Sequence, residues 1–121
     1  LWFCMSKKIL SKNVTLCTSV FKKGIGLMFM PKMNDFAFVF PFSSPRKLSI
    51  TMWFVFFPID ILFLDEHNVV VQTKERMKPF TVYTTTQKAQ TFIELPAGSI
   101  SKHSLVKGNR ITWDTHSVCS D

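Results

Sequence analysis

The sequence is poor in acidic residues, and none occurs before Asp35. Across the 121 residues, 8 Asp and Glu stand against 15 Lys and Arg, which gives a formal net charge of +7. A basic excess favours an anionic partner such as nucleic acid or a lipid surface, although it also serves solubility. The lysines are scattered, and no recognition helix or aromatic-basic motif accompanies them. We therefore expect nucleic-acid binding to be weak and non-specific, if it occurs.

Cysteine is also scarce, with Cys4, Cys17 and Cys119 far apart and no C-x-x-C pair among them. This spacing does not predict a zinc site, and we expect neither a metal nor a cofactor. We expect the three thiols to be reduced, which fits a reducing compartment. The short apolar pair Ile9 and Leu10 is too small for the core of a secretory signal. Together these observations predict a cytoplasmic protein.

The chain lacks an apolar run of the roughly 20 residues that a membrane-spanning helix needs. The apolar stretch 52–64 is shorter, and Pro58 and Asp60 interrupt it. A folded core explains this stretch better than a bilayer does. Because proline removes a backbone donor, we predict that one strand, 48–57, ends here and a second, 59–64, begins, or that a single strand is bulged. The pair would form the centre of the fold.

What the chain has in abundance is phenylalanine, with 13 residues, and hydrophobic residues make up 46% of the sequence. This composition and length predict one folded domain with a single core. We place the domain at residues 13–114, with a disordered or extraneous segment at 1–12 and a tail at 115–121. We expect a monomer or a weak homo-oligomer. The predicted core includes Phe38, Phe40, Met52, Phe54, Ile61 and Phe63.

Hydrophobic periodicity predicts further strands between turn residues. Two short segments have helical spacing, at 21–28 and at 99–105, and the polar segment 74–90 is expected to be irregular or an edge. The other predicted strands are 14–20, 36–40 (ended by Pro41), 69–73 (joined to 59–64 by a turn at 65–68), 91–95 and 110–113. The predicted class is α+β, mainly antiparallel β in a barrel-like or sandwich-like sheet, with two short helices.

Several separated motifs occur in a common order. They are Gly26-Leu27-Met28-Phe29, Phe38-Val39-Phe40, Met52 with Pro58-Ile59-Asp60, Phe63-Leu64-Asp65, Glu94-Leu95-Pro96-Ala97-Gly98, and Gly108 before the last strand. From about Val14 to Trp113 the chain closely resembles the domain of unknown function 192 family, most of all its archaeal branch. The resemblance implies a compact, mostly β fold and no established activity. The chain departs from bacterial relatives at Trp53-Phe54-Val55, where they tend to carry Lys-Asn-Thr.

Two carboxylates are the candidate chemical groups. Asp60 lies in an apolar stretch, where burial disfavours its charge unless N–H donors or a cation compensate. We expect it to accept backbone N–H groups left unpaired at the Pro58 bend; a ligand-binding or catalytic role and exposure through a bulge are the alternatives. Strand alternation predicts that Glu94 points outward. If the two converged, a two-carboxylate catalytic site would be possible.

Two classes of function remain. The first, which we favour, is a non-enzymatic binding or interaction module for a small ligand or protein partner, and an exposed apolar patch would support it. Its candidate ligand-binding residues are Met52, Trp53, Asp60 and Glu94. The alternative is a small hydrolase or lyase with Asp60 and Glu94 as catalytic residues, which a pocket holding both would support.

Overall fold

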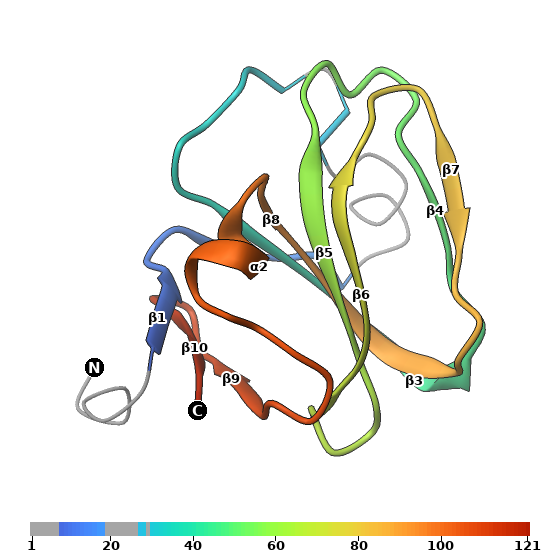
Figure 1. The fold of residues 1–121 in the computed structure, drawn as a ribbon, viewed down its shortest axis with the longest axis vertical. Helices are drawn as coiled ribbons and strands as arrows, with labels where there is room; N and C mark the ends of the chain where they lie inside the picture. Colours follow the sequence, from blue (N-terminus) through green and yellow to red (C-terminus); the bar gives the residue numbers. More distant parts are fainter. Residues whose placement is uncertain (1–7, 19–26, 29) are drawn as a thin grey trace.

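The computed structural model describes residues 8–18, 27–28 and 30–121. The regular secondary structure of this part of the chain is β strands and one short helix (Figure 1). The elements are β1 (Lys8–Ser11), β2 (Val14–Leu16), β3 (Ala37–Arg46), β4 (Ser49–Thr51), β5 (Ile59–Leu64), β6 (Val70–Met77), β7 (Val82–Thr84), β8 (Ala89–Pro96), α2 (Ser99–Lys102), β9 (Ile111–Trp113) and β10 (Val118–Ser120).

The strands form three sheets. The largest has the order β2-β3-β8-β5-β6, and a second has the order β1-β10-β9; the third is the pair β4-β7. All neighbours are antiparallel except β2 and β3, so the predicted mainly antiparallel β fold is confirmed. The pairings among residues 8–18 and 30–121 close no barrel, and the barrel-like alternative is wrong.

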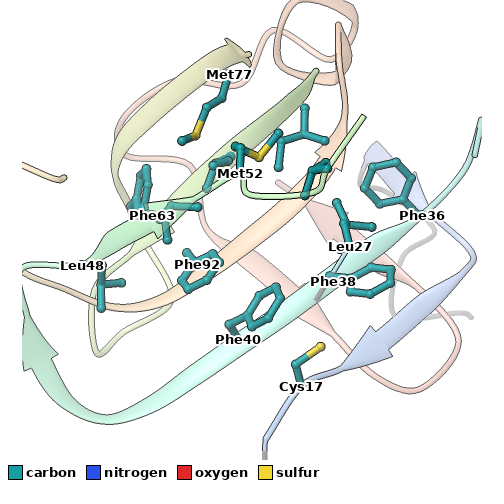
Figure 2. Close-up of a cluster of buried hydrophobic side chains, with 14 of the residues drawn as sticks. Cys17, Leu27, Phe36, Phe38, Phe40, Leu48, Met52, Phe63, Met77 and Phe92 are labelled. Carbon is teal, nitrogen blue, oxygen red and sulfur yellow. The ribbon is translucent and has the colours of Figure 1, made fainter. Parts of the chain in front are cut away.

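The five-stranded sheet is buried on both faces. Along β5, Ile61 and Phe63 enter one hydrophobic core, while Leu62 and Leu64 enter the other. A strand covered on both sides needs apolar residues at every position, which explains the uninterrupted run in this stretch. Figure 2 shows the first core, where the rings of Phe40 and Phe92 stack with centroids 4.4 Å apart.

Two outer layers cover these faces. The first core is closed by Ile50 of β4 and Tyr83 of β7. The second is closed by α2, which contributes Ile100, and by the three-stranded sheet, which contributes Ile111 and Val118. In Figure 1 the β4-β7 pair lies on the opposite side of β5 and β6 from the β1-β10-β9 sheet.

The predicted strand at 48–57 is wrong beyond residue 51. β4 ends at Thr51 and pairs with β7 instead of β5, whose neighbours are β8 and β6. Residues 52–58 form a loop in which the Val55 N–H donates to the Met52 carbonyl. Phe54, predicted to lie in the core, is 46% exposed and has a φ of 58°. The other five predicted core residues are buried: Phe38, Phe40, Met52, Ile61 and Phe63.

One further strand prediction needs correction. β3 continues past Pro41 to Arg46, with a break in its register with β8 between those residues, so Pro41 bulges the strand instead of ending it. The segment 74–90, predicted to be irregular or an edge, contains the end of β6, which is the edge strand of the largest sheet, and β7 of the two-stranded sheet. The predicted hairpin between β5 and β6 is present, and the Asp65 carboxylate accepts the backbone N–H groups of His67 and Val69 in its turn.

Of the two predicted helices, the one at 99–105 is present but shorter, since α2 ends at Lys102. The prediction of a helix at 21–28 falls outside the described residues except for 27–28, which lie in a turn. β1 and β10 pair with each other, so regular pairing extends beyond both boundaries expected at residues 12 and 115.

Cys17 is a buried thiol, but Cys119 is disulfide-bonded. The expectation that all three thiols are reduced is therefore wrong at Cys119. Because that expectation supported a reducing compartment, the cytoplasmic location stays a prediction without this support.

Candidate functional site

Four aromatic side chains contact one another where the loop 52–58 meets the turn between β6 and β7. These two backbone segments lie at the top of Figure 1. We call Trp53, Phe54, Phe56 and Phe80 the aromatic surface; their exposed fractions are 48, 46, 61 and 42%. The Phe80 ring lies at its centre, with centroid distances of 6.4, 5.8 and 5.4 Å to the other three rings. All three contacts are edge-to-face, an arrangement that aromatic quadrupoles favour.

The backbone of Met52 holds the two segments together. Its N–H donates to the Thr81 carbonyl at 2.8 Å, and its carbonyl accepts the Phe80 N–H at 2.9 Å. The Met52 side chain is fully buried, and Val55 and Phe57 of the same loop enter the first core. Three buried anchors in the loop thus fix the backbone from which the exposed rings project.

Two rings of the aromatic surface project from a strained backbone. Phe54 and Phe80 both have a φ of 58°, in the left-handed region. Bulky residues rarely occupy this region, at a cost of about 1–3 kcal/mol each, and such strain clusters at functional sites. The strain is compatible with folding because the Met52 hydrogen bonds and the buried anchors determine the path of the chain.

A groove of about 200 Å³ adjoins the aromatic surface between β6 and β7. We call it the basic groove because Lys74, Arg76 and Lys78 line it, and none of the described residues in its lining is a carboxylate. The other described lining residues are Met77, Thr81, Val82 and Tyr83. The Lys74 ammonium lies 5.0 Å from the centroid of the Tyr83 ring, within range for a cation–π contact. The Tyr83 hydroxyl accepts a hydrogen bond from the Gln72 amide, which ties β7 to β6.

Asp60 is fully buried and accepts three backbone hydrogen bonds. Its Oδ1 accepts the Arg76 N–H at 2.9 Å, and its Oδ2 accepts the N–H groups of Gly98 and Ile100 at 3.1 and 2.8 Å. These donors come from β6 and from the start of α2, not from the Pro58 bend as expected. Since the Arg76 φ of 50° places it in the left-handed region, Asp60 also holds the backbone at one side of the basic groove.

Glu94 is buried, with 6% of its surface exposed, so the prediction that it points outward is wrong. Burial raises the pKa of its carboxyl from 4.5 to about 8. Its Oε1 atom has no hydrogen-bond partner in the described part of the chain. The alternation along β8 did not reveal this, because both faces of the sheet are covered.

The structure does not bring Asp60 and Glu94 together. In the register of β5 with β8, Asp60 lies opposite Leu95, whereas Glu94 lies opposite Ile61. Leu95 belongs to the second core and Ile61 to the first. Since neighbouring residues of a strand point to opposite faces, the sheet itself separates the two carboxylates.

Of the predicted site residues, only Trp53 lies on the aromatic surface, while Met52 anchors it from the core. Sequence reasoning missed Phe54 and Phe56 as surface residues and did not identify the basic groove. One signal was available in Phe80, an aromatic residue directly after Pro79 in a polar segment, where a turn tip is typical.

Neither a metal centre nor a membrane-spanning helix is found among the described residues. No group of three or more His, Cys, Asp or Glu side chains in residues 8–18, 27–28 and 30–121 is arranged to hold a metal ion. Within the same ranges, no helix has the length and apolar character required to traverse a bilayer.

Comparison with known proteins gives sequence relatives over most of the chain. Residues 4–113 match the model of the DUF192 family, described as "Uncharacterized ACR". A UPF0127 protein from Thermococcus sibiricus is 35% identical over 108 residues, covering 88% of this chain and 70% of the relative. A UPF0127 protein from Pyrococcus horikoshii is 30% identical over 103 residues, covering 85% and 89% of the two chains.

Two crystal structures have a similar fold. A putative transcription regulator from Sinorhizobium meliloti matches with a TM-score of 0.75 and 23% identity, over 80% of this chain and 78% of that one. A protein of unknown function from Novosphingobium aromaticivorans matches with a TM-score of 0.77 and 18% identity, over 83% and 74% of the two chains. At these identities the likeness concerns the fold alone.

Proposed function

Because the chain belongs to the DUF192 family, whose description assigns no activity, we propose a function from its own surface: it is a non-enzymatic binding module. The aromatic surface would engage a protein partner or a small ligand. The observation that carries the proposal is the convergence of three exposed rings on a fourth, Phe80. Scattered exposed apolar side chains are ordinary, whereas a contiguous patch marks an interaction site.

The strained backbone supports the same conclusion. A glycine at position 54 or 80 would relieve the backbone strain, since glycine adopts a positive φ without a steric clash. The chain instead places large apolar rings there and leaves them in contact with water. A binding role explains both the strain and the exposure, because the rings lose their contact with water only when a partner covers them.

The enzymatic alternative has less support. A hydrolase or lyase with paired carboxylates needs both groups on one substrate, yet the sheet lies between Asp60 and Glu94. Asp60 also has three of its acceptor positions filled by backbone N–H groups. The two carboxylates cannot reach one substrate together, so we favour the binding module.

A nucleic-acid role has some support in the description of the Sinorhizobium protein as a putative transcription regulator. That protein is only 23% identical to this chain, and among the described residues the single helix, α2, has four residues, too few for a recognition helix. Our proposal for nucleic acid therefore remains weak, non-specific binding.

The test uses 8-anilinonaphthalene-1-sulfonate, an apolar anion whose fluorescence rises in apolar surroundings. We expect it to bind the folded wild-type chain and to lose most of that binding in the double variant Trp53→Ser/Phe56→Ser. The matched control is Leu16→Ser/Val106→Ser, which removes two comparably exposed apolar side chains elsewhere. The control should bind the probe like wild type.

Both double variants change exposed positions, so their unfolding midpoints should match wild type and show that each variant is folded. Equal probe binding by wild type and by Trp53→Ser/Phe56→Ser would contradict the proposal. Loss of binding in the control alone would also contradict it, since Leu16 lines a separate surface hollow with Val14 and Trp113.

A further inference from the structure

We propose that the aromatic surface and the basic groove together dock the protein on an anionic lipid surface. This inference rests on the proposed binding function and names its partner. The two features adjoin along the chain, because Lys78, Phe80 and Thr81 belong to one short turn. The turn and the 52–58 loop lie at the same end of the molecule (Figure 1).

The aromatic surface suits the boundary between lipid headgroups and acyl chains. Its side chains are one Trp and three Phe, and Trp and Phe are the residues with which interfacial segments enter this boundary. The rings come from two adjacent loop tips whose backbones are hydrogen-bonded through Met52. Because the four rings lie together and are exposed, several of them can enter a lipid surface at once.

The basic groove supplies the complementary charge. Lys74, Arg76 and Lys78 would approach phosphate headgroups when the adjoining rings enter the surface, and the groove lining contains no carboxylate to oppose them. Lys and Arg extend apolar stems while keeping their charge in water, which suits this depth. The net charge of +7 adds a longer-range attraction of the same sign.

The same charges disfavour the other occupants of this surface. In a symmetric dimer the basic groove of each copy would adjoin the shared interface, and two chains of charge +7 repel. Interfaces with proteins are depleted in Lys, whereas two of the three cations here are Lys. An anionic lipid surface instead attracts Lys and Arg alike.

The experiment is vesicle co-sedimentation with two compositions, phosphatidylcholine alone and an equimolar mixture of phosphatidylcholine and phosphatidylglycerol. We expect the wild-type chain to bind the mixed vesicles and not the neutral ones, with binding that weakens as salt rises. Trp53→Ser/Phe56→Ser and Lys74→Gln/Lys78→Gln should each lower the partition coefficient by about tenfold or more.

The matched controls are Leu16→Ser/Val106→Ser for apolar loss and Lys102→Gln/Lys107→Gln for charge loss at other positions. Both should bind mixed vesicles within about twofold of wild type, because the changed residues lie outside the aromatic surface and the basic groove. If Lys102→Gln/Lys107→Gln weakens binding as much as Lys74→Gln/Lys78→Gln, the attraction is that of the whole chain and the inference is wrong.

The outcomes separate this inference from the proposed function. If the fluorescent probe binds at the aromatic surface but no vesicle does, the lipid partner is wrong and the binding module stands. If size-exclusion chromatography shows a dimer that Trp53→Ser/Phe56→Ser dissociates, and vesicles do not bind, the occupant is a second copy. If vesicles bind equally well after the aromatic change, the aromatic surface takes no part in lipid binding and this inference is wrong, whereas probe binding still decides the binding module.

Discussion

Two carboxylates lie buried in the five-stranded sheet, and their surroundings differ. Asp60 accepts three backbone N–H groups, so its lone pairs are satisfied by the chain itself. Glu94 has an Oε1 without a partner in the described part of the chain, and burial raises its pKa to about 8. The hydrogen bonds of Asp60 are those of a group that holds elements together. The surroundings of Glu94 keep its carboxyl protonated near neutral pH.

We predict that Glu94 makes the folded state less stable as the pH rises. Its pKa is about 8 in the folded chain against an ordinary value of 4.5, so between these limits the folded state binds more protons than the unfolded state. Its contribution to the free energy of unfolding is therefore full below about pH 4.5 and is lost, at up to about 1.4 kcal/mol per unit, as the pH rises through 8. Chemical denaturation at several pH values measures this.

The variant Glu94→Gln is the matched comparison, because it keeps the shape and cannot ionise. Its stability relative to wild type should rise steadily from pH 5 to pH 8 and level off above that. Taking the difference cancels the effects of other groups, such as His103, whose pKa burial lowers. A difference that does not change with pH would show that Glu94 is not buried as described.

We predict that Asp60→Asn lowers the free energy of unfolding by about 1–3 kcal/mol. The asparagine keeps one acceptor oxygen but loses the charge, and its NH₂ group would face backbone N–H donors. Asp60→Ala should cost at least as much. The control is Glu66→Gln, which removes a carboxylate that is half exposed and should have almost no effect.

A structural Asp60 is contradicted by one outcome in particular. If Asp60→Asn kept or raised the melting temperature while abolishing binding of the fluorescent probe, the carboxylate would be a functional group. Trading stability for activity is characteristic of functional sites. Asp60 would then join the basic groove through its hydrogen bond with the Arg76 N–H.

At the scale of elements, the chain shows which patterns identify a strand. β5 and β8 were predicted from short apolar runs bounded by turn residues, and both are present at the centre of the sheet. The run 52–57 has the same composition but forms a loop. It buries Met52, Val55 and Phe57 and exposes Trp53, Phe54 and Phe56, a spacing that neither strand nor helix periodicity describes. Apolar content alone could not reveal an exposed site made of the same residues as the core.

This correction predicts opposite outcomes for two phenylalanines. Phe63→Ala should cost about 3–5 kcal/mol, because it leaves a cavity in the first core. Phe54→Gly should change the free energy of unfolding by less than about 1 kcal/mol, since glycine relieves the positive φ while the exposed ring is lost. Urea unfolding compares the two. If Phe54→Gly lowered the free energy of unfolding as much as Phe63→Ala, the predicted strand at 48–57 would be right and the loop wrong.

The strand β10 gives a second prediction at this scale. Val118 is fully buried in the second core, between β1 and β9, although the sequence placed it in a tail. Val118→Ala should lower the free energy of unfolding by about 2 kcal/mol. Val106→Ala, at an exposed position, should have little effect. If both variants left the free energy of unfolding almost unchanged, the last residues would lie outside the folded domain.

At the scale of the molecule, the family and the β-rich class were predictable, and the assembly of the sheets was not. Separated motifs such as Pro58-Ile59-Asp60 identified the DUF192 family, which the match over residues 4–113 confirms. The pairing of β1 with β10 joins residues more than a hundred positions apart. Such pairings depend on packing across the whole chain, which local periodicity does not contain. The aromatic surface arises from the same cause, because the pairing of β4 with β7 brings residues 53 and 80 together.

The last prediction concerns the charge of the whole molecule. Because the lysines are distributed over the chain, we expect duplex DNA to bind weakly and without sequence preference, with a slope of log affinity against log salt of about −3. Fluorescence anisotropy with two unrelated duplexes measures this. Two double variants should weaken DNA binding equally, because each removes two positive charges: Lys74→Gln/Lys78→Gln and Lys102→Gln/Lys107→Gln. With anionic vesicles, by contrast, only the first should weaken binding. Binding that selects one duplex and survives physiological salt would require base readout, and would favour a nucleic-acid function over the lipid surface.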